Sequence, residues 1–170
     1  FPAGTGLLIS GGRKLILQMH YNTASGVYPD RTSVRLQLEE RVDRIARFQP
    51  IADPDMNVAP GQELGMTVRT HPVADPVPVT IWGVGPHMHT LGKTLRLEAA
   101  FRDGDECLVD VERWNFHWQD AWWYETPIKG TADSVTISCG YDTRARSTPV
   151  TWGEGTSDEM CLAYLYLTFP

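Results

Sequence analysis

Short segments in which apolar and polar residues alternate recur along the whole chain, separated by Gly, Pro and Asp residues. Alternation with a period of two is typical of strands that bury one face, whereas a helix repeats about every 3.6 residues. The candidate strands span residues 13–21, 33–39, 44–48, 64–70, 77–87, 95–102, 106–112, 134–141 and 161–169. Many brief strands with this spacing predict an all-β fold, an antiparallel β-sandwich of jelly-roll type.

The length of the chain, 170 residues, suits one domain, and no internal repeat or linker divides it. We therefore expect one compact unit. Within it, residues 1–22 are expected to be a remnant of a preceding domain or its last strand, and residues 23–170 the jelly-roll domain. Since the sequence opens at Phe1 with neither an initiator Met nor a cleavable signal, we expect a processed or recombinant piece of a longer protein.

The charge and hydrophobicity of the chain argue against two classes of partner. The formal net charge is −6, and no run of Lys and Arg is available to neutralise phosphates, so no nucleic acid is expected as a partner. No stretch approaches the roughly 20 apolar residues of a membrane-spanning helix, so no membrane span is expected.

The tripeptide His87-Met88-His89 ends one candidate strand and presents two imidazoles on the same face. Side chains two positions apart on a strand project in parallel at roughly 7 Å spacing, which makes half of a metal site. A thioether from Met160, brought in from another strand, would complete a set of two nitrogens and one sulfur. Zinc sites rarely use Met, whereas thioether ligands select Cu(I). The pattern predicts a mononuclear copper site with an open coordination position.

The three cysteines are an odd number, and one disulfide plus one free thiol is the simplest arrangement. Cys161 follows Met160 directly, so on a strand their side chains leave opposite faces. A bridge from Cys161 to Cys139, its natural partner, would anchor the sheet, fix the thioether and leave Cys107 as the thiol. A disulfide favours a secreted, periplasmic or otherwise extracytoplasmic protein, and three buried thiols in a cytosolic protein are the alternative.

Plainer interpretations of these residues stay open. A His-x-His strand can equally present two exposed or hydrogen-bonded imidazoles, and a lone Met is usually a core residue. His20 can be a surface or interface histidine, and His117 belongs to an aromatic cluster that more often fills a core than binds a ligand. Asp158 and Glu159 are interpreted as acids that orient an imidazole.

Three other functions compete with copper-dependent oxygen chemistry. The first is a non-catalytic module that stores, delivers or senses Cu(I). The second is a metal-free sandwich that recognises carbohydrate or protein through its Trp-rich stretch. The third is a zinc hydrolase, which would need a third hard ligand near His87, and the sequence offers only Asp158, Glu159 or a distant histidine.

Four motifs occur in an order that resembles one enzyme family. They are Leu17-Gln18-Met19-His20-Tyr21-Asn22, Pro86-His87-Met88-His89-Thr90-Leu91-Gly92-Lys93, Trp114-Asn115-Phe116-His117-Trp118-Gln119 and Gly155-Thr156-Ser157-Asp158-Glu159-Met160-Cys161. Together they resemble the copper type II, ascorbate-dependent monooxygenases, which include peptidylglycine α-hydroxylating monooxygenase and dopamine β-monooxygenase. The likeness covers essentially the whole chain and corresponds to the C-terminal catalytic domain plus the last strand of the domain before it.

The resemblance implies a copper-dependent monooxygenase whose centre is the site described above. The copper would bind dioxygen and hydroxylate an activated C–H bond of a small organic or peptide-like substrate, with ascorbate as the external reductant. The residues that match the family's ligands of this catalytic copper are His87, His89 and Met160.

The resemblance also assigns other roles and has departures. His20 matches a ligand of a second copper that passes electrons, and Tyr164 matches a substrate-side residue. Cys139 and Cys161 match a disulfide pair. The adjacent His pair that completes the second copper lies upstream in the family and is absent here, so we expect the chain to be incomplete without an upstream copper domain. Gly85 stands where the peptide hydroxylase has an arginine for the substrate carboxylate, which argues against peptide amidation.

Overall fold

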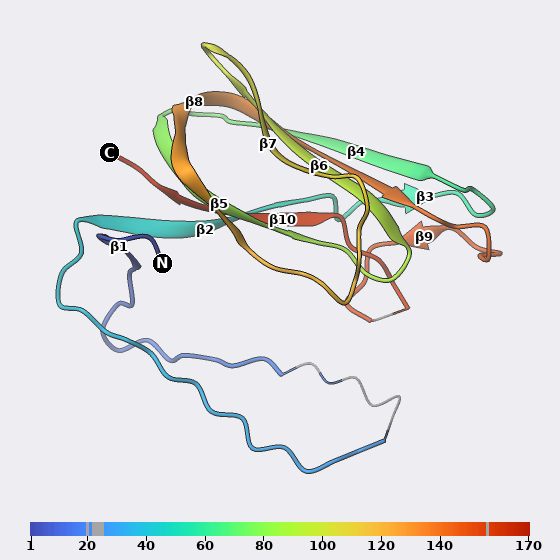
Figure 1. Ribbon diagram of the computed structural model, residues 1–170, viewed down its shortest axis with the longest axis horizontal. Coiled ribbons are helices and arrows are strands. Elements are labelled where there is room, and N and C mark those ends of the chain that lie inside the picture. The colour runs from blue at the N-terminus through green and yellow to red at the C-terminus, as the bar shows by residue number, and fades with distance from the viewer. Residues whose placement is uncertain (20, 22–25, 156) are drawn as a thin grey trace.

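The structure, a computed structural model, describes residues 1–19, 21, 26–155 and 157–170, and these residues form strands, turns and loops without any helix. The strands are β1 (Thr5–Leu7), β2 (Arg44–Ala52), β3 (Asn57–Val58), β4 (Gly65–Pro72), β5 (Pro78–His87), β6 (Gly92–Phe101), β7 (Gly104–Val111), β8 (Trp122–Tyr141), β9 (Val150–Thr151) and β10 (Leu162–Thr168) (Figure 1). The expectation of an all-β sandwich is confirmed. Within the described part of the chain, nothing forms a helix long and apolar enough to cross a membrane.

The strand β8 runs through both layers of the sandwich. Its first half, residues 122–131, pairs with β5, and its second half, residues 132–141, lies between β4 and β6. One layer, which we call the β10 sheet, therefore has the order β1-β2-β10-β5-β8, and the other, the β6 sheet, has the order β4-β8-β6-β7 (Figure 1). In both layers the described strands pair antiparallel, except that β1 runs parallel to β2.

Side chains that alternate along the facing strands fill the space between the two sheets. Leu95 and Leu97 of β6, Ile137 of β8 and Leu165 of β10 are at most 2% exposed. Burial of each such side chain contributes about 1.5–3 kcal/mol. The core therefore comes from the same alternation that predicts the strands.

One disulfide joins the two layers. Cys139 lies in β8 within the β6 sheet, and its partner Cys161 immediately precedes β10. Both residues are completely buried, whereas Cys107 in β7 is a free, exposed thiol. The bridge ties the start of β10 to the opposite sheet.

Two of the candidate strands do not form. Residues 13–19, 21 and 33–39 are outside any strand, and the chain between β1 and β2 leaves the sandwich and returns to it (Figure 1). Their apolar side chains are exposed, as for Ile16, which is 90% exposed. Alternation yields a strand only where a neighbour pairs with its backbone and a second layer covers its apolar face. The described chain supplies neither here, so both predictions were wrong.

Three strands were not predicted from the sequence, and one strand is longer than predicted. The strands β1, β3 and β9 are two or three residues long, too short for alternation to be visible. The strand β8 begins at Trp122 rather than at residue 134. Its first half contains consecutive aromatic residues, so its pairing with β5 depends on the sheet rather than on a local pattern.

Candidate metal centre

The register between β5 and β10 sets the geometry of the candidate site. Leu162, the first residue of β10, pairs with His87, the last residue of β5. The pairing ends at these two residues, and two positions further along each segment His89 and Met160 line the same pocket as His87. Positions two apart along a strand point to the same face. The four side chains therefore belong to one face, the outer face of the β10 sheet.

His87 and His89 lie side by side, and Met88 between them points into the core. The centroids of the two imidazole rings are 5.1 Å apart and their planes are 83° apart. Met88 is completely buried, and His89 is 5% exposed. Alternation at the end of β5 thus brings two imidazoles together while the intervening side chain anchors the backbone.

Hydrogen bonds determine which nitrogen of each ring keeps a lone pair. His87 Nδ1 lies 2.6 Å from Oε1 of Gln119, and His89 Nδ1 lies 2.9 Å from the backbone oxygen of Asp158. A carbonyl oxygen only accepts, so Nδ1 donates in both rings and Nε2 is left free. Burial lowers the pKa of His87, the hydrogen bond with Gln119 opposes part of this shift, and His89 adds to it. The neutral, metal-binding form of His87 is therefore favoured.

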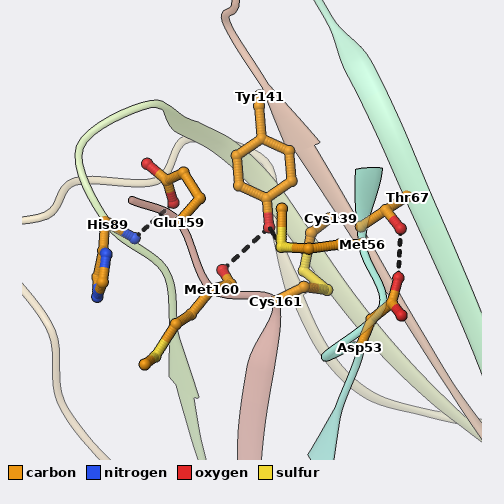
Figure 2. Close-up of a disulfide and its surroundings, with 9 residues drawn as sticks. All are labelled: Asp53, Met56, Thr67, His89, Cys139, Tyr141, Glu159, Met160 and Cys161. Carbon is orange, nitrogen blue, oxygen red and sulfur yellow. Dashed lines mark hydrogen bonds between the residues drawn. A yellow bond between two sulfur atoms is a disulfide. The ribbon is translucent and has the colours of Figure 1, made fainter. Parts of the chain in front are cut away.

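Two links to β8 hold Met160 in place. The hydroxyl of Tyr141 donates to the backbone oxygen of Met160 at 2.9 Å, and the next residue, Cys161, is bonded to Cys139. Burial raises the pKa of the Tyr141 hydroxyl, so this group remains a donor. Figure 2 shows the Met160 side chain extending away from the disulfide, on the side where His89 lies.

Glu159 connects the segment before β10 to the turn after β5. Its completely buried carboxylate accepts hydrogen bonds from the backbone N–H groups of His89 at 2.8 Å and Leu91 at 2.6 Å. Burial raises the pKa of this carboxyl, and the two backbone donors oppose the rise. The sequence analysis expected the Asp158 and Glu159 carboxylates to orient an imidazole ring. The structure shows different atoms in this role. Asp158 contacts the His89 ring through its backbone oxygen, and Glu159 holds the backbone of that residue.

Trp114 holds the turn of residues 89–93 from another side. Its indole N–H donates to the backbone oxygen of His89 at 3.1 Å, and its backbone N–H donates to the backbone oxygen of Lys93 at 2.7 Å. Sequence reasoning grouped Trp114 with an aromatic cluster and missed this role. The available signal is general: an indole N–H that is partly buried needs an acceptor.

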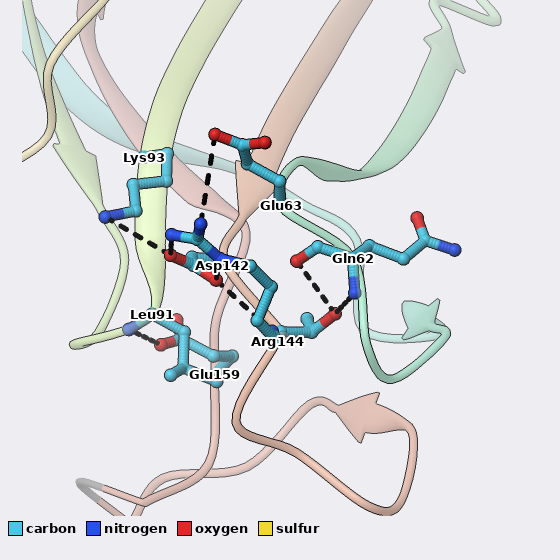
Figure 3. Close-up of polar contacts among 8 residues, drawn as sticks. Gln62, Glu63, Leu91, Lys93, Asp142, Arg144 and Glu159 are labelled. Atoms are coloured by element: carbon cyan, nitrogen blue, oxygen red, sulfur yellow. Dashed lines mark hydrogen bonds and ion pairs between the residues drawn. The ribbon is translucent and has the colours of Figure 1, made fainter.

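An ion cluster at the end of β8 supports the same turn. The backbone N–H of Asp142 donates to the backbone oxygen of Leu91 at 2.9 Å. Figure 3 shows the Asp142 carboxylate between Arg144, at 2.5 Å, and Lys93, at 3.8 Å. The Arg144 guanidinium holds the pKa of the Asp142 carboxyl well below its usual range. Water screens exposed pairs of this kind, so their main effect is to order the loop.

The two imidazoles open into a groove of about 1030 Å³ on the outer face of the β10 sheet, and Met160 lines it beside them. Its wall is rich in aromatic side chains: Tyr21, Phe48, Phe116, Trp123, Trp152, Tyr164 and Tyr166. Among the described residues that line it, Asp120 and Glu154 carry full charges, and no Lys or Arg is present. The groove is therefore aromatic and acidic.

The donors in the groove suit a soft metal ion. They are two imidazole nitrogens with free lone pairs and one thioether. In the part of the chain that the structure describes, no three His, Cys, Asp or Glu side chains come close enough to hold a metal ion. His20 lies outside the described residues, and His117 is exposed.

Comparison with known proteins matches the chain to a family and to curated relatives, which include a tyramine beta-hydroxylase. The family model described as copper type II ascorbate-dependent monooxygenase, C-terminal domain, matches residues 50–168. Tyramine beta-hydroxylase of Caenorhabditis briggsae is 33% identical over 92 residues, which are 52% of the chain and 15% of that relative. The chain thus spans a small part of the length of this relative.

Proposed function

Because the chain belongs to the copper type II, ascorbate-dependent monooxygenase family, as its C-terminal domain, we propose that it is the hydroxylating copper domain of such an enzyme. The proposed ligands are the imidazoles of His87 and His89 and the thioether of Met160. The observation that supports the proposal is that all three side chains line one groove, beyond the paired ends of β5 and β10.

Each proposed ligand has a distinct task. His87 and His89 offer Nε2, because the Nδ1–H of each ring is already hydrogen-bonded. Met160 offers a soft sulfur, which favours reduced copper. When bound, copper supplies the one-electron chemistry with dioxygen that hydroxylation of an activated C–H bond requires, with ascorbate as the external reductant. The aromatic side chains that line the groove would contact the substrate and orient it.

The proposed centre is one half of a two-copper enzyme. Hydroxylation consumes a pair of electrons beyond those of the substrate C–H bond, and the sequence encodes one complete set of copper ligands. An upstream domain would hold the second copper, and His20 would contribute to it. Turnover would then depend on electrons that arrive from that domain.

The first test is X-ray absorption on the copper-loaded, reduced protein. We expect one copper per chain and a copper–sulfur scattering shell that disappears in Met160→Leu. The matched control is Met66→Leu, because Met66 is an exposed methionine of β4 in the β6 sheet that does not line the groove, and its removal should leave the sulfur shell intact. A sulfur shell that survives in Met160→Leu, or an absence of copper binding, would contradict the proposed ligand set.

The proposed substrate is a small aromatic amine. A cationic amine suits a groove whose charged lining residues are Asp120 and Glu154, and its ring suits the aromatic wall. The name of the relative tyramine beta-hydroxylase points to the same class of molecule. Gly85 adds no cation to the groove for a substrate carboxylate.

The amine proposal predicts weaker binding when the acids of the groove are neutralised. In Asp120→Asn and Glu154→Gln, the Kd for tyramine should rise about two- to fivefold each, since an exposed ion pair is worth about 0.5–1 kcal/mol. Calorimetric titration of the intact chain measures this Kd. Asp105→Asn, which removes an exposed acid outside the groove, is the control and should leave the Kd unchanged. Equal binding by all variants would refute the role of the two acids.

An extracytoplasmic location completes the proposal. The buried Cys139–Cys161 bridge joins the two sheets, and structural disulfides form and persist in oxidising compartments. A secreted or periplasmic setting is therefore the environment in which this fold keeps its cross-link.

A further inference from the structure

Both polar atoms of the Gln119 side-chain amide form hydrogen bonds. Its Nε2 donates to the backbone oxygen of Phe116 at 2.7 Å, and its Oε1 lies 2.6 Å from His87 Nδ1. The backbone oxygen of Phe116 only accepts, so the amide atom beside it must be the nitrogen. The other end, which faces His87, is then the oxygen. One hydrogen bond therefore fixes the orientation of the other.

The two imidazoles differ in what orients them. The Nδ1–H of His89 donates to a backbone oxygen, that of Asp158, which no substitution of the Asp158 side chain removes. The Nδ1–H of His87 donates to a side chain, that of Gln119. The orientation of His87 thus depends on the identity of one residue, 32 positions away in the sequence.

We propose that Gln119 is a positioning residue that fixes His87 in its Nδ1–H tautomer and thereby leaves Nε2 free for the metal. Free neutral histidine prefers the opposite tautomer, with the proton on Nε2. A ligand that must first change tautomer binds a metal less tightly, and partners of this kind typically change metal affinity about 10- to 100-fold. The affinity part of this inference rests on the proposed copper site, whereas the tautomer part concerns the metal-free chain.

The direct test is 15N NMR of the metal-free protein, labelled at histidine, at a pH well above the usual histidine pKa of about 6.5. In the wild type, His87 should show a protonated Nδ1 and an unprotonated Nε2. In Gln119→Leu, which has no acceptor, the proton should shift toward Nε2. In Gln119→Glu, which keeps an acceptor, the wild-type tautomer should return. A merely structural role for Gln119 would not produce this rescue.

A second readout is the affinity for Cu(I), measured by competition with a chromogenic chelator. We expect about 10- to 100-fold weaker binding in Gln119→Leu and less than a threefold loss in Gln119→Glu. The control Gln49→Leu removes an exposed glutamine of β2 that does not line the groove, and should bind copper like the wild type.

The outcomes separate this inference from the proposed function. A wild-type chain that binds no Cu(I) but shows the expected tautomers would refute the copper site and support the role of Gln119. An unchanged His87 tautomer in a folded Gln119→Leu variant would overturn that role, whatever the affinity for copper. If Gln119→Leu does not fold, the Gln119→Glu variant tests the positioning role instead. Loss of the Nδ1–H tautomer of His87 in that variant would overturn the role of Gln119.

Discussion

Replacing Cys139 and Cys161 together by alanine is expected to lower the free energy of unfolding by about 3 kcal/mol. The bridge spans a sequence separation of 22, and closing a loop of this size restricts the unfolded chain by about that amount. Alanine at both positions avoids placing a hydroxyl in sites that are completely buried. Urea denaturation followed by tryptophan fluorescence measures the loss.

The same double variant should also weaken the candidate metal centre. Cys161 directly follows Met160, and the bridge ties this part of the chain to β8. Without it, the hydroxyl of Tyr141 remains as the other link from β8 to the Met160 backbone. We therefore expect weaker binding of Cu(I) together with lower stability.

The free thiol Cys107 provides the matched control for the disulfide variant. It is exposed and unpaired with another cysteine, so Cys107→Ala should change the free energy of unfolding by less than about 0.5 kcal/mol. A loss below about 1 kcal/mol in the double variant would show that the bridge does not restrict the unfolded chain as argued.

Glu159→Ala is the second variant for which a large effect is expected, a loss of roughly 2–6 kcal/mol in the free energy of unfolding. The substitution removes the acceptor of two backbone N–H groups, those of His89 and Leu91. Each donor left buried without an acceptor costs about 1–3 kcal/mol. Because both donors belong to the turn that follows His87, the loss should be accompanied by weaker binding of Cu(I).

A graded series separates hydrogen bonding from the loss of volume at position 159. Glu159→Gln keeps the shape but only one acceptor oxygen, so its stability should lie between that of the wild type and that of Glu159→Ala. Glu125→Ala removes an exposed acid of β8 and should stay within about 0.5 kcal/mol of the wild type. Equal stability of the wild type and Glu159→Ala would mean that the backbone donors find other acceptors.

Alternation of apolar and polar residues predicted strands correctly where a neighbouring strand pairs with the segment. The alternation of Leu95, Leu97 and Ala99 in β6 predicts a buried face, and these three side chains are completely buried. The same kind of alternation at Leu15 and Leu17 predicts a strand that the structure does not contain. The difference lies outside both segments, because β6 has β7 and β8 on its two sides.

The sequence predicts which residues are the candidate ligands, but it does not predict all of the contacts that hold them. The His-x-His spacing and the position of Met160 next to Cys161 are visible in the chain, and their role as copper ligands stays a prediction. Of the residues that orient them, Asp158 and Glu159 were predicted from the sequence without the atoms that they use, and Trp114 was not predicted. Trp114 is 25 positions from His89, and Glu159 is 70 positions from it. No local pattern encodes such contacts, because they arise when distant strands pair.

The sequence by itself determined the all-β character and the sandwich, because alternation is a local property that each segment carries with it. Only the tertiary structure decided which segments became neighbours and in what register. That choice depends on burying several apolar faces at once, which no single segment controls. The pairing of Leu162 with His87 is one result of it, and beyond the paired ends of the two strands Met160 and the two histidines line one groove.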